Sequence, residues 1–173
     1  MEKEQNINEC VKESITIALL NLMRKKDFSE IKITEIVNLA GVGRTSFYRN
    51  FESKEDVLKK HINNLYSDYF LTHKVPDAAS TAEEKREHMI SRFRFVKQNS
   101  EFFILLNKNN LLYEVFESID SDIFNKIATI NIGNSYESAF TASGCVGVIK
   151  EWINRKFKET EEELTDIFME LNR

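Results

Sequence analysis

The sequence contains little proline, glycine or cysteine, and these shortages restrict its fold. Its 173 residues include one proline and five glycines, and no run of alternating β-branched residues stands out. This composition, with apolar residues at helical spacing, predicts an all-α protein. Cys10 and Cys145 form neither a metal-ligand motif nor a disulfide framework, so we expect a reducing compartment. Cys145 has no adjacent cation in the sequence, and we expect a buried, inert thiol.

The sequence also lacks a long apolar run. No stretch approaches the ~18 apolar residues that would cross a membrane, and the charged N-terminus lacks the apolar centre of a signal peptide. We therefore expect a cytoplasmic protein with no membrane partner. Apolar residues still make up 42% of the chain, which is enough to bury a core. The three histidines are scattered, and no nucleophile–base pair or phosphate loop occurs, so we expect no metal, no cofactor and no enzymatic activity.

Residues 31–57 predict two short helices joined by a tight turn. Apolar residues recur there at steps of three and four, as on one buried helix face: Ile33, Ile36, Val37 and Ala40. Gly41 follows, and a glycine can adopt the positive φ that ends a helix. The chain then restarts at Arg44, after Gly43 in the N-cap position. A glycine is a weaker N-cap than a serine by only a few tenths of a kcal/mol, so the helix should still form.

The second short helix, from Arg44 to about Asn50, should have two different faces. At 100° per residue, Phe47 and Phe51 share one face, which we expect to be buried. The polar and basic side chains lie opposite that face or flank it: Arg44, Thr45, Ser46, Tyr48 and Arg49. Tyr48 could also be partly core. No acidic residue occurs between positions 36 and 51, although the net charge of the chain is −4. This pattern is typical of a helix-turn-helix whose second helix enters the DNA major groove.

The same residues carry a family resemblance. The run AGVGRTSFYRNFESKEDVL, at positions 40–58, resembles the N-terminal DNA-binding domain of TetR/AcrR-type transcriptional regulators. Spacing and residue type agree over nearly the whole run. Four positions depart from the family pattern: Gly43 replaces a serine, Ser46 a threonine and Asn50 a histidine, and Lys32 stands where a threonine commonly caps the preceding helix.

The resemblance implies a set of DNA contacts. We expect Arg44 to bind a guanine, because a guanidinium fork matches its O6 and N7 atoms, and Thr45 to touch a base edge. The remaining contacts, several of them to phosphates, are expected from Thr34, Ser46, Tyr48, Arg49, Asn50 and Lys54. Lys54 should lie in the first turn of a helix, where backbone N–H groups already favour an anion. Thr34 could instead cap its helix, and Arg49 could simply be solvated.

The rest of the chain predicts a helical bundle. We expect a three-helix DNA-binding domain at residues 1–65, joined by a long helix to a regulatory and dimerisation domain at residues 66–173, with about nine helices in all. Three sites are predicted helix caps: Thr81-x-x-Glu84, Ser100 and Thr160-x-x-Glu163. The run ASGCVGVIKEWINRKF, at positions 142–157, is similar to a subgroup that includes dihydroxyacetone-kinase regulators.

Two functional surfaces are expected in this second domain. Ala139, Ser143 and Gly147 recur every fourth residue, so their helix face would let another helix come close. In TetR-type regulators the last two long helices pair with those of a second copy. The resemblance thus implies an interface formed by Ala139, Ser143, Gly147, Leu164, Ile167, Phe168 and Leu171. An effector pocket could be lined by aromatic residues, which are more often simply core: Phe93, Phe102, Phe103, Tyr113 and Phe116.

These observations predict a one-component DNA-binding transcriptional regulator. Its expected partners are double-stranded DNA, a second copy of itself and any small-molecule effector of the second domain. As a homodimer it would bind a two-fold symmetric operator. The resemblance implies a repressor, released when a ligand moves the long helix. The alternative is a helical ligand- or protein-binding module that has lost DNA binding and acts as a co-regulator.

Overall fold

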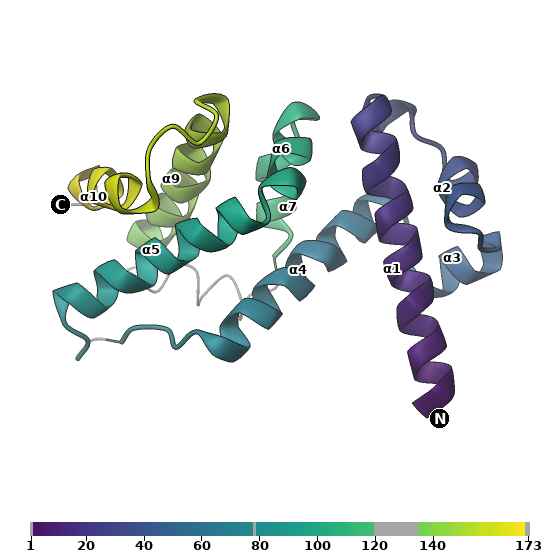
Figure 1. Ribbon diagram of the computed structural model, residues 1–173, viewed down its shortest axis with the longest axis horizontal. Helices are drawn as coiled ribbons and strands as arrows, with labels where there is room; N and C mark the ends of the chain where they lie inside the picture. Colours follow the sequence, from purple (N-terminus) through teal and green to yellow (C-terminus); the bar gives the residue numbers. More distant parts are fainter. Residues whose placement is uncertain (1, 78, 120–134, 172–173) are drawn as a thin grey trace. The chain divides into compact units, whose positions relative to one another are not determined.

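The computed structural model describes residues 2–77, 79–119 and 135–171, and within these ranges the ordered elements are all helical (Figure 1). Nine α-helices and one 3-10 helix are present in the described residues, which confirms the predicted all-α fold. The chain packs as two compact units, Met1–Ile62 and Asn63–Arg173. The predicted domain boundary, after residue 65, lies close to this division in the sequence. None of the helices described is both long and apolar enough to cross a membrane.

The first unit is a helix-turn-helix packed on a long helix. Its elements are α1 (Glu2–Lys25), η1 (Phe28–Glu30), α2 (Ile33–Ala40), α3 (Arg44–Asn50) and the start of α4 (Lys54–Thr72). Helix α1 packs against both α2 and α3. It contributes Ile15, Leu19 and Met23, which recur every fourth residue and are fully buried. The core of this unit therefore holds both short helices against one face of α1.

The second unit is a bundle of five further described helices and the end of α4. These helices are α5 (Ala82–Gln98), α6 (Ser100–Lys108), α7 (Leu112–Glu117), α9 (Ser135–Asn154) and α10 (Glu161–Leu171). The predicted caps of α5 and α10 are confirmed, because Thr81 and Thr160 each accept a hydrogen bond from the backbone N–H three residues later, at 3.2 and 3.1 Å. The predicted cap at Ser100 is wrong, since Asn99 occupies the N-cap and Ser100 is the first residue of α6.

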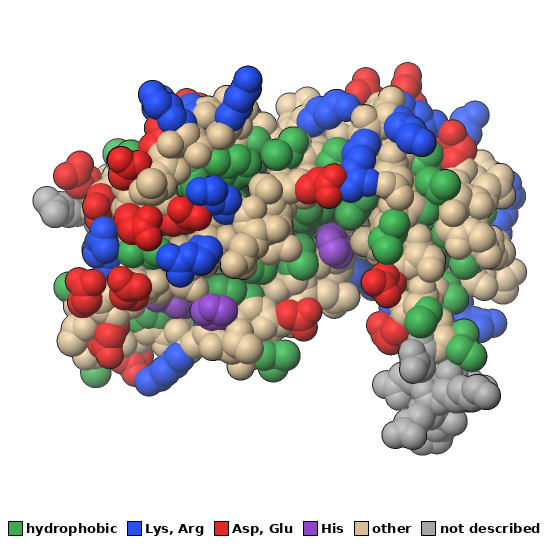
Figure 2. Space-filling view, in the orientation of Figure 1, with side chains coloured by type: hydrophobic (Ala, Val, Ile, Leu, Met, Phe, Trp, Pro, Cys, Tyr) green, Lys and Arg blue, Asp and Glu red, His purple; other side chains and the backbone are tan. Residues whose placement is uncertain are grey.

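Aromatic side chains and ion pairs join α5 to α10. The Phe93 ring meets the ring of Phe168 edge to face, with centroids 6.1 Å apart. Three ion pairs flank this contact: Arg86–Asp166, Arg94–Glu162 and Lys97–Glu161. Acidic and basic side chains are correspondingly interspersed on the face drawn in Figure 2. Burial of the rings supplies most of the stabilisation, because exposed ion pairs contribute only ~0–1 kcal/mol each.

A buried cation lies beside the thiol of Cys145. The Arg92 guanidinium approaches Sγ to 4.0 Å, so the expectation that no cation adjoins this thiol is wrong. The two residues are far apart in sequence, and only the packing of α5 against α9 brings them together. Burial raises the pKa of Cys145, and the Arg92 charge offsets this only in part. A thiol with a raised pKa carries little thiolate, which agrees with the predicted inert cysteine.

Candidate nucleic-acid interface

The turn between α2 and α3 begins at Gly41, as predicted. Gly41 adopts φ 68° and ψ 29°, in the left-handed region that favours glycine. The N–H of Val42 donates to the carbonyl of Val37 at 3.0 Å, and that of Gly41 donates to Asn38 at 3.3 Å. These two bonds form a Schellman motif, which satisfies the last carbonyls of α2. The turn therefore has a defined geometry that sets the direction in which α3 starts.

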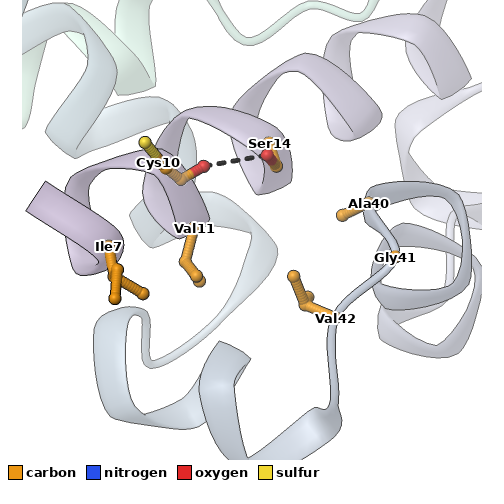
Figure 3. Close-up of a pocket in the computed structure, with 7 residues that line it drawn as sticks. All are labelled: Ile7, Cys10, Val11, Ser14, Ala40, Gly41 and Val42. Carbon is orange, nitrogen blue, oxygen red and sulfur yellow. Dashed lines mark hydrogen bonds between the residues drawn. The ribbon is translucent and has the colours of Figure 1, made fainter.

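The turn also packs against α1. Figure 3 shows Val42 pointing toward Val11 of α1, with Ile7 one turn away along the same helix. These side chains line a shallow pocket of about 410 Å³. Cys10 also lines it, and its carbonyl accepts a hydrogen bond from the Ser14 hydroxyl at 2.8 Å. Apolar side chains of α1 and of the turn thus face one another across this pocket.

Helix α3 is anchored by two phenyl rings. Phe47 is fully buried and Phe51 is 3% exposed, with ring centroids 5.9 Å apart. Arg44, Thr45 and Arg49 are exposed. The predicted two-faced helix is therefore confirmed, and its bounds are those expected from the sequence. Its outer surface offers guanidinium and hydroxyl groups with no acidic neighbour on α3.

Tyr48 and Ser46 complete the outer surface of α3. Tyr48 is 58% exposed, so its hydroxyl can reach solvent or a ligand. One edge of its ring still contacts Phe47, with centroids 5.4 Å apart. Ser46 is half-buried, and its carbonyl accepts a bond from the side chain one turn later. Both side chains can contact DNA without leaving their positions on the helix.

The prediction that Asn50 contacts DNA is corrected by the structure. Its side chain is 8% exposed, and Nδ2 donates to the carbonyl of Ser46 at 2.8 Å. The Asn50 carbonyl accepts from Nζ of Lys60 at 2.8 Å. The side-chain amide thus binds within α3, and the Asn50 carbonyl binds Lys60 because the last carbonyls of a helix have no intrahelical partners. Lys60 is a residue that sequence reasoning missed, since nothing in its spacing from α3 indicates the contact.

Lys54, which was predicted to bind a phosphate, has partners within the protein, and its phosphate contact stays a prediction. Its ammonium donates to the carbonyls of Phe28 at 2.5 Å and Ile31 at 3.0 Å, with Ser29 at 3.4 Å. It also lies 4.4 Å from the centroid of the Phe28 ring, within range of a cation–π interaction. An ammonium has three donors, and these carbonyls engage them. Lys54 is therefore a contact between α4 and η1.

Thr34 lies in the first turn of α2 and is half-buried. It does not cap this helix, because Lys32 occupies the N-cap position. Glu35 supplies the cap contact, accepting a hydrogen bond from the N–H of Lys32 at 3.0 Å. The ammonium of Lys26 lies 2.7 Å from the same carboxylate and, with that bond, lowers the pKa of Glu35.

Two family profiles match this chain. The profile described as bacterial regulatory proteins of the tetR family matches residues 15–60, which include the whole helix-turn-helix. A profile described as a transcriptional regulator C-terminal region matches residues 83–173, more than half of the chain. The chain belongs to the TetR family of bacterial regulatory proteins. It is accordingly a DNA-binding transcriptional regulator, and the helix-turn-helix is its DNA-binding element.

Two solved structures share the fold of this TetR-family chain. One is a protein from Syntrophomonas wolfei assigned to the TetR family of transcriptional regulators, with a TM-score of 0.68 and 19% identity over 95% of this chain and 94% of that one. The other is a TetR transcriptional regulator from Streptococcus agalactiae, with a TM-score of 0.62 and 19% identity over 99% and 98%. At this identity they show the fold alone. No curated protein matches the chain. The similarity to dihydroxyacetone-kinase regulators stays a prediction.

The aromatic residues predicted to line an effector pocket are mostly core in this TetR-family regulator. Phe93, Phe102, Phe103 and Phe116 are buried, and Tyr113 is 45% exposed. The ring of Phe103 packs against those of Phe102 and Phe116, at centroid distances of 5.7 and 5.9 Å. Neighbouring rings thus occupy the space that a ligand would need. The aromatic composition was correctly noted, but sequence could not show that the rings fill the interior themselves.

A groove of about 460 Å³ lies elsewhere in the second unit, between the end of α4 and the start of α5. His88, Ser91 and Glu87 are among its lining residues. His88 is 7% exposed, and within the described part of the chain its Nε2 atom has no hydrogen-bond partner. Burial lowers the pKa of His88 to about 4, so its imidazole is neutral at pH 7. No three His, Cys, Asp or Glu side chains in the described ranges come together as a metal site.

The predicted dimer residues fall into two groups. Ala139 and Ser143 of α9 are exposed, as are Ile167 and Leu171 of α10, while Gly147 is partly exposed. Leu164 and Phe168 are buried within the unit, so their assignment to a dimer contact is corrected. On α10, Phe168 faces α5 of its own chain, because its ring packs on that of Phe93.

Sequence reasoning missed two large apolar residues on the same face of α9. Tyr136 is 84% exposed and Phe140 is 68% exposed. Tyr136 and Phe140 lie four residues apart, and each precedes a small residue, Ala139 or Ser143, by three residues, so all four share one face of the helix. The sequence contained this signal, because steps of three and of four residues both keep side chains on one helix face. Exposed aromatic side chains beside small residues form a surface suited to a second helix.

Proposed function

We propose that this TetR-family protein represses transcription by binding a two-fold symmetric operator as a homodimer. The observation that carries the proposal is the orientation of α3, which buries Phe47 and Phe51 and leaves Arg44 and Thr45 exposed. A helix of this kind, with hydrogen-bonding groups outward, fits the major groove and can read base edges.

The exposed side chains of the helix-turn-helix suggest a division of roles. Arg44, in the first turn of α3, is proposed to bind guanine, since its fork is exposed. Thr45 is proposed to contact a neighbouring base edge. Tyr48 and Arg49 from α3, with Thr34 from α2, would bind phosphates and thereby fix the register of α3 in the groove. Ser46 has the same proposed role, with its hydroxyl as the donor.

The proposed homodimer is supported by the exposed face of α9. Tyr136 and Phe140 present apolar surface there, and the small residues Ala139 and Ser143 beside them leave room for a helix from a second copy. Ile167 and Leu171 of α10 add further exposed apolar area. A two-fold symmetric pairing through such a surface would present two copies of α3 to successive major grooves of one operator.

Release by a small ligand stays a prediction. The groove beside His88 is the place in the second unit where we would test it, because its neutral imidazole and the nearby Ser91 offer polar contacts to a ligand. The proposed repression also stays a prediction, since an activator could present the same recognition helix.

Selecting genomic DNA fragments that bind the purified protein tests the proposed function. One operator class with two-fold symmetry is expected, bound with an affinity that falls linearly on a log–log plot as salt rises. The number of phosphates contacted follows from that slope, at ~0.9 units per phosphate. Failure to enrich any fragment, at low as well as physiological salt, would contradict DNA binding and favour the co-regulator alternative.

A further inference from the structure

Lys60 of α4 holds the C-terminal end of the recognition helix. Its ammonium donates to the carbonyl of Asn50, the last residue of α3, at 2.8 Å, and to Oδ2 of Asp56 at the same distance. It also lies 5.3 Å from the centroid of the ring of Phe51, the C-cap residue of α3. A cation is favourable there, because the last carbonyls of a helix lack intrahelical partners and carry partial negative charge.

Lys54, six residues earlier on α4, makes the equivalent contact with η1. Its ammonium donates to the carbonyls of Phe28 and Ile31, at 2.5 and 3.0 Å, and lies over the Phe28 ring. Ile31 is the C-cap of η1 and immediately precedes the N-cap of α2. The first helix of the helix-turn-helix is thus fixed to α4 at its start, and the second helix is fixed to α4 at its end.

The start of α4 is itself well defined. The Ser53 hydroxyl accepts from the N–H of Asp56 at 3.2 Å, as an N-cap side chain does. The Asp56 carboxylate accepts from the N–H of Glu52 at 2.9 Å, as well as from Lys60. Lys60 therefore binds a carboxylate that is already oriented, which reduces the entropy lost in holding its long side chain.

We propose that Lys54 and Lys60 are positioning residues, which make α2, α3 and the first turns of α4 move as one body. In this proposal neither lysine binds a DNA phosphate. Both act through the carbonyls they bind, so a change in the direction of α4 changes the direction of α3 by the same rotation. The inference rests on the proposed function, in which α3 reads the operator, and it assigns the coupling between α4 and α3 to two named side chains.

A competing assignment is that either lysine binds a DNA phosphate. The two assignments predict different salt behaviour. A lysine that neutralises a phosphate contributes ~0.9 to the slope of log affinity against log salt, and its removal lowers the slope by that amount. A lysine that binds carbonyls within the protein releases no counterion from DNA, so its removal leaves the slope unchanged.

The test uses Lys54→Met and Lys60→Met in the full chain, because methionine keeps an unbranched stem and removes the charge. Lys25→Met is the matched control, since Lys25 is an exposed lysine in the last turn of α1 and carries the same charge. Lys60→Arg and Lys54→Arg keep a cationic donor.

Hydrogen exchange of the free proteins is measured first. The affinity for operator and for unrelated DNA is then measured over a salt series, at a temperature where every variant is folded.

We expect amides in the last turn of α3 to exchange at least about tenfold faster in Lys60→Met, and those around η1 to do so in Lys54→Met. Operator affinity should fall at least about tenfold, and affinity for unrelated DNA less than about threefold, with an unchanged slope. The arginine variants should restore most of the operator affinity, and Lys25→Met should match the parent in exchange and in operator preference.

Two results would overturn the proposal. In the first, a methionine variant lowers the slope of log affinity against log salt by about one unit and leaves amide exchange unchanged. In the second, the methionine variants match the parent in both operator affinity and amide exchange. Failure of the parent protein to bind any DNA would contradict the proposed function instead. The exchange measurement would still decide whether the two lysines fix α2 and α3 to α4, because it needs no DNA.

Discussion

Truncation of Phe47 to alanine should remove most of the stability of the DNA-binding unit. Phe47 is fully buried, and its ring contacts those of Phe51 and Tyr48. Replacing a buried phenylalanine by alanine costs about 3–5 kcal/mol, through lost burial and the cavity left behind. A unit of 62 residues has a total stability of about 3–9 kcal/mol at typical values per residue. Phe47→Ala should therefore leave this unit partly or wholly unfolded at 25 °C.

Hydrogen exchange resolves this effect by unit, whereas a single melting curve would average over both units. The amides of Ile15 and Leu19, in the core of α1, report on the first unit. They should lose protection in Phe47→Ala, while amides around Phe93 in the second unit keep theirs. Tyr48→Ala is the matched control, because it truncates the adjacent aromatic residue, which is 58% exposed, and should cost less than about 1 kcal/mol. Equal losses in the two variants, or a cost below about 1 kcal/mol for Phe47→Ala, would refute the anchoring role of Phe47.

Three further predictions concern the second unit. Burial lowers the pKa of His88 from 6.5 to about 4. The unfolded chain therefore takes up a proton at this residue as the pH falls below 6.5, and the folded chain does so only near pH 4. The free energy of unfolding should therefore fall as the pH is lowered from 6.5 to about 4, and it should fall less in His88→Gln. Urea midpoints measured at a series of pH values would show this. Phe140→Glu should convert the proposed dimer to a monomer in light scattering; an unchanged dimer would remove α9 from the interface. Arg94→Ala should change the free energy of unfolding, measured by urea denaturation, by less than about 1 kcal/mol, because its 3.6 Å pair with Glu162 is exposed.

Local sequence signals were enough to predict the helix-turn-helix. Gly41 ends α2 because glycine readily adopts a positive φ, and the four-residue step from Phe47 to Phe51 places both rings on one face. The capping boxes at Thr81 and Thr160 also depend only on residues three apart in sequence. Each of these features is decided within one or two helical turns, so tertiary contacts had little opportunity to override it.

Features that depend on distant parts of the chain were not predicted. The carbonyls bound by Lys54 lie 23 to 26 residues earlier in the sequence, and no local pattern indicates them. Phe168 was predicted to lie in an interface, but the sequence could not show whether its partner is α5 of the same chain or a second copy. Asn50 was misassigned because a polar residue on a short helix can bind DNA or its own backbone, and only the coordinates distinguish the two.

The central claim is that α3 reads DNA through the side chains it exposes opposite Phe47 and Phe51. It is tested most directly by measuring the affinity of Arg44→Ala for its selected operator and for unrelated DNA, in the same salt series. Loss of one bidentate guanine contact should weaken operator binding by about 1–3 kcal/mol, or roughly 5- to 150-fold, with a much smaller effect on unrelated DNA. An Arg44→Ala protein that keeps the operator preference of the parent would contradict the claim.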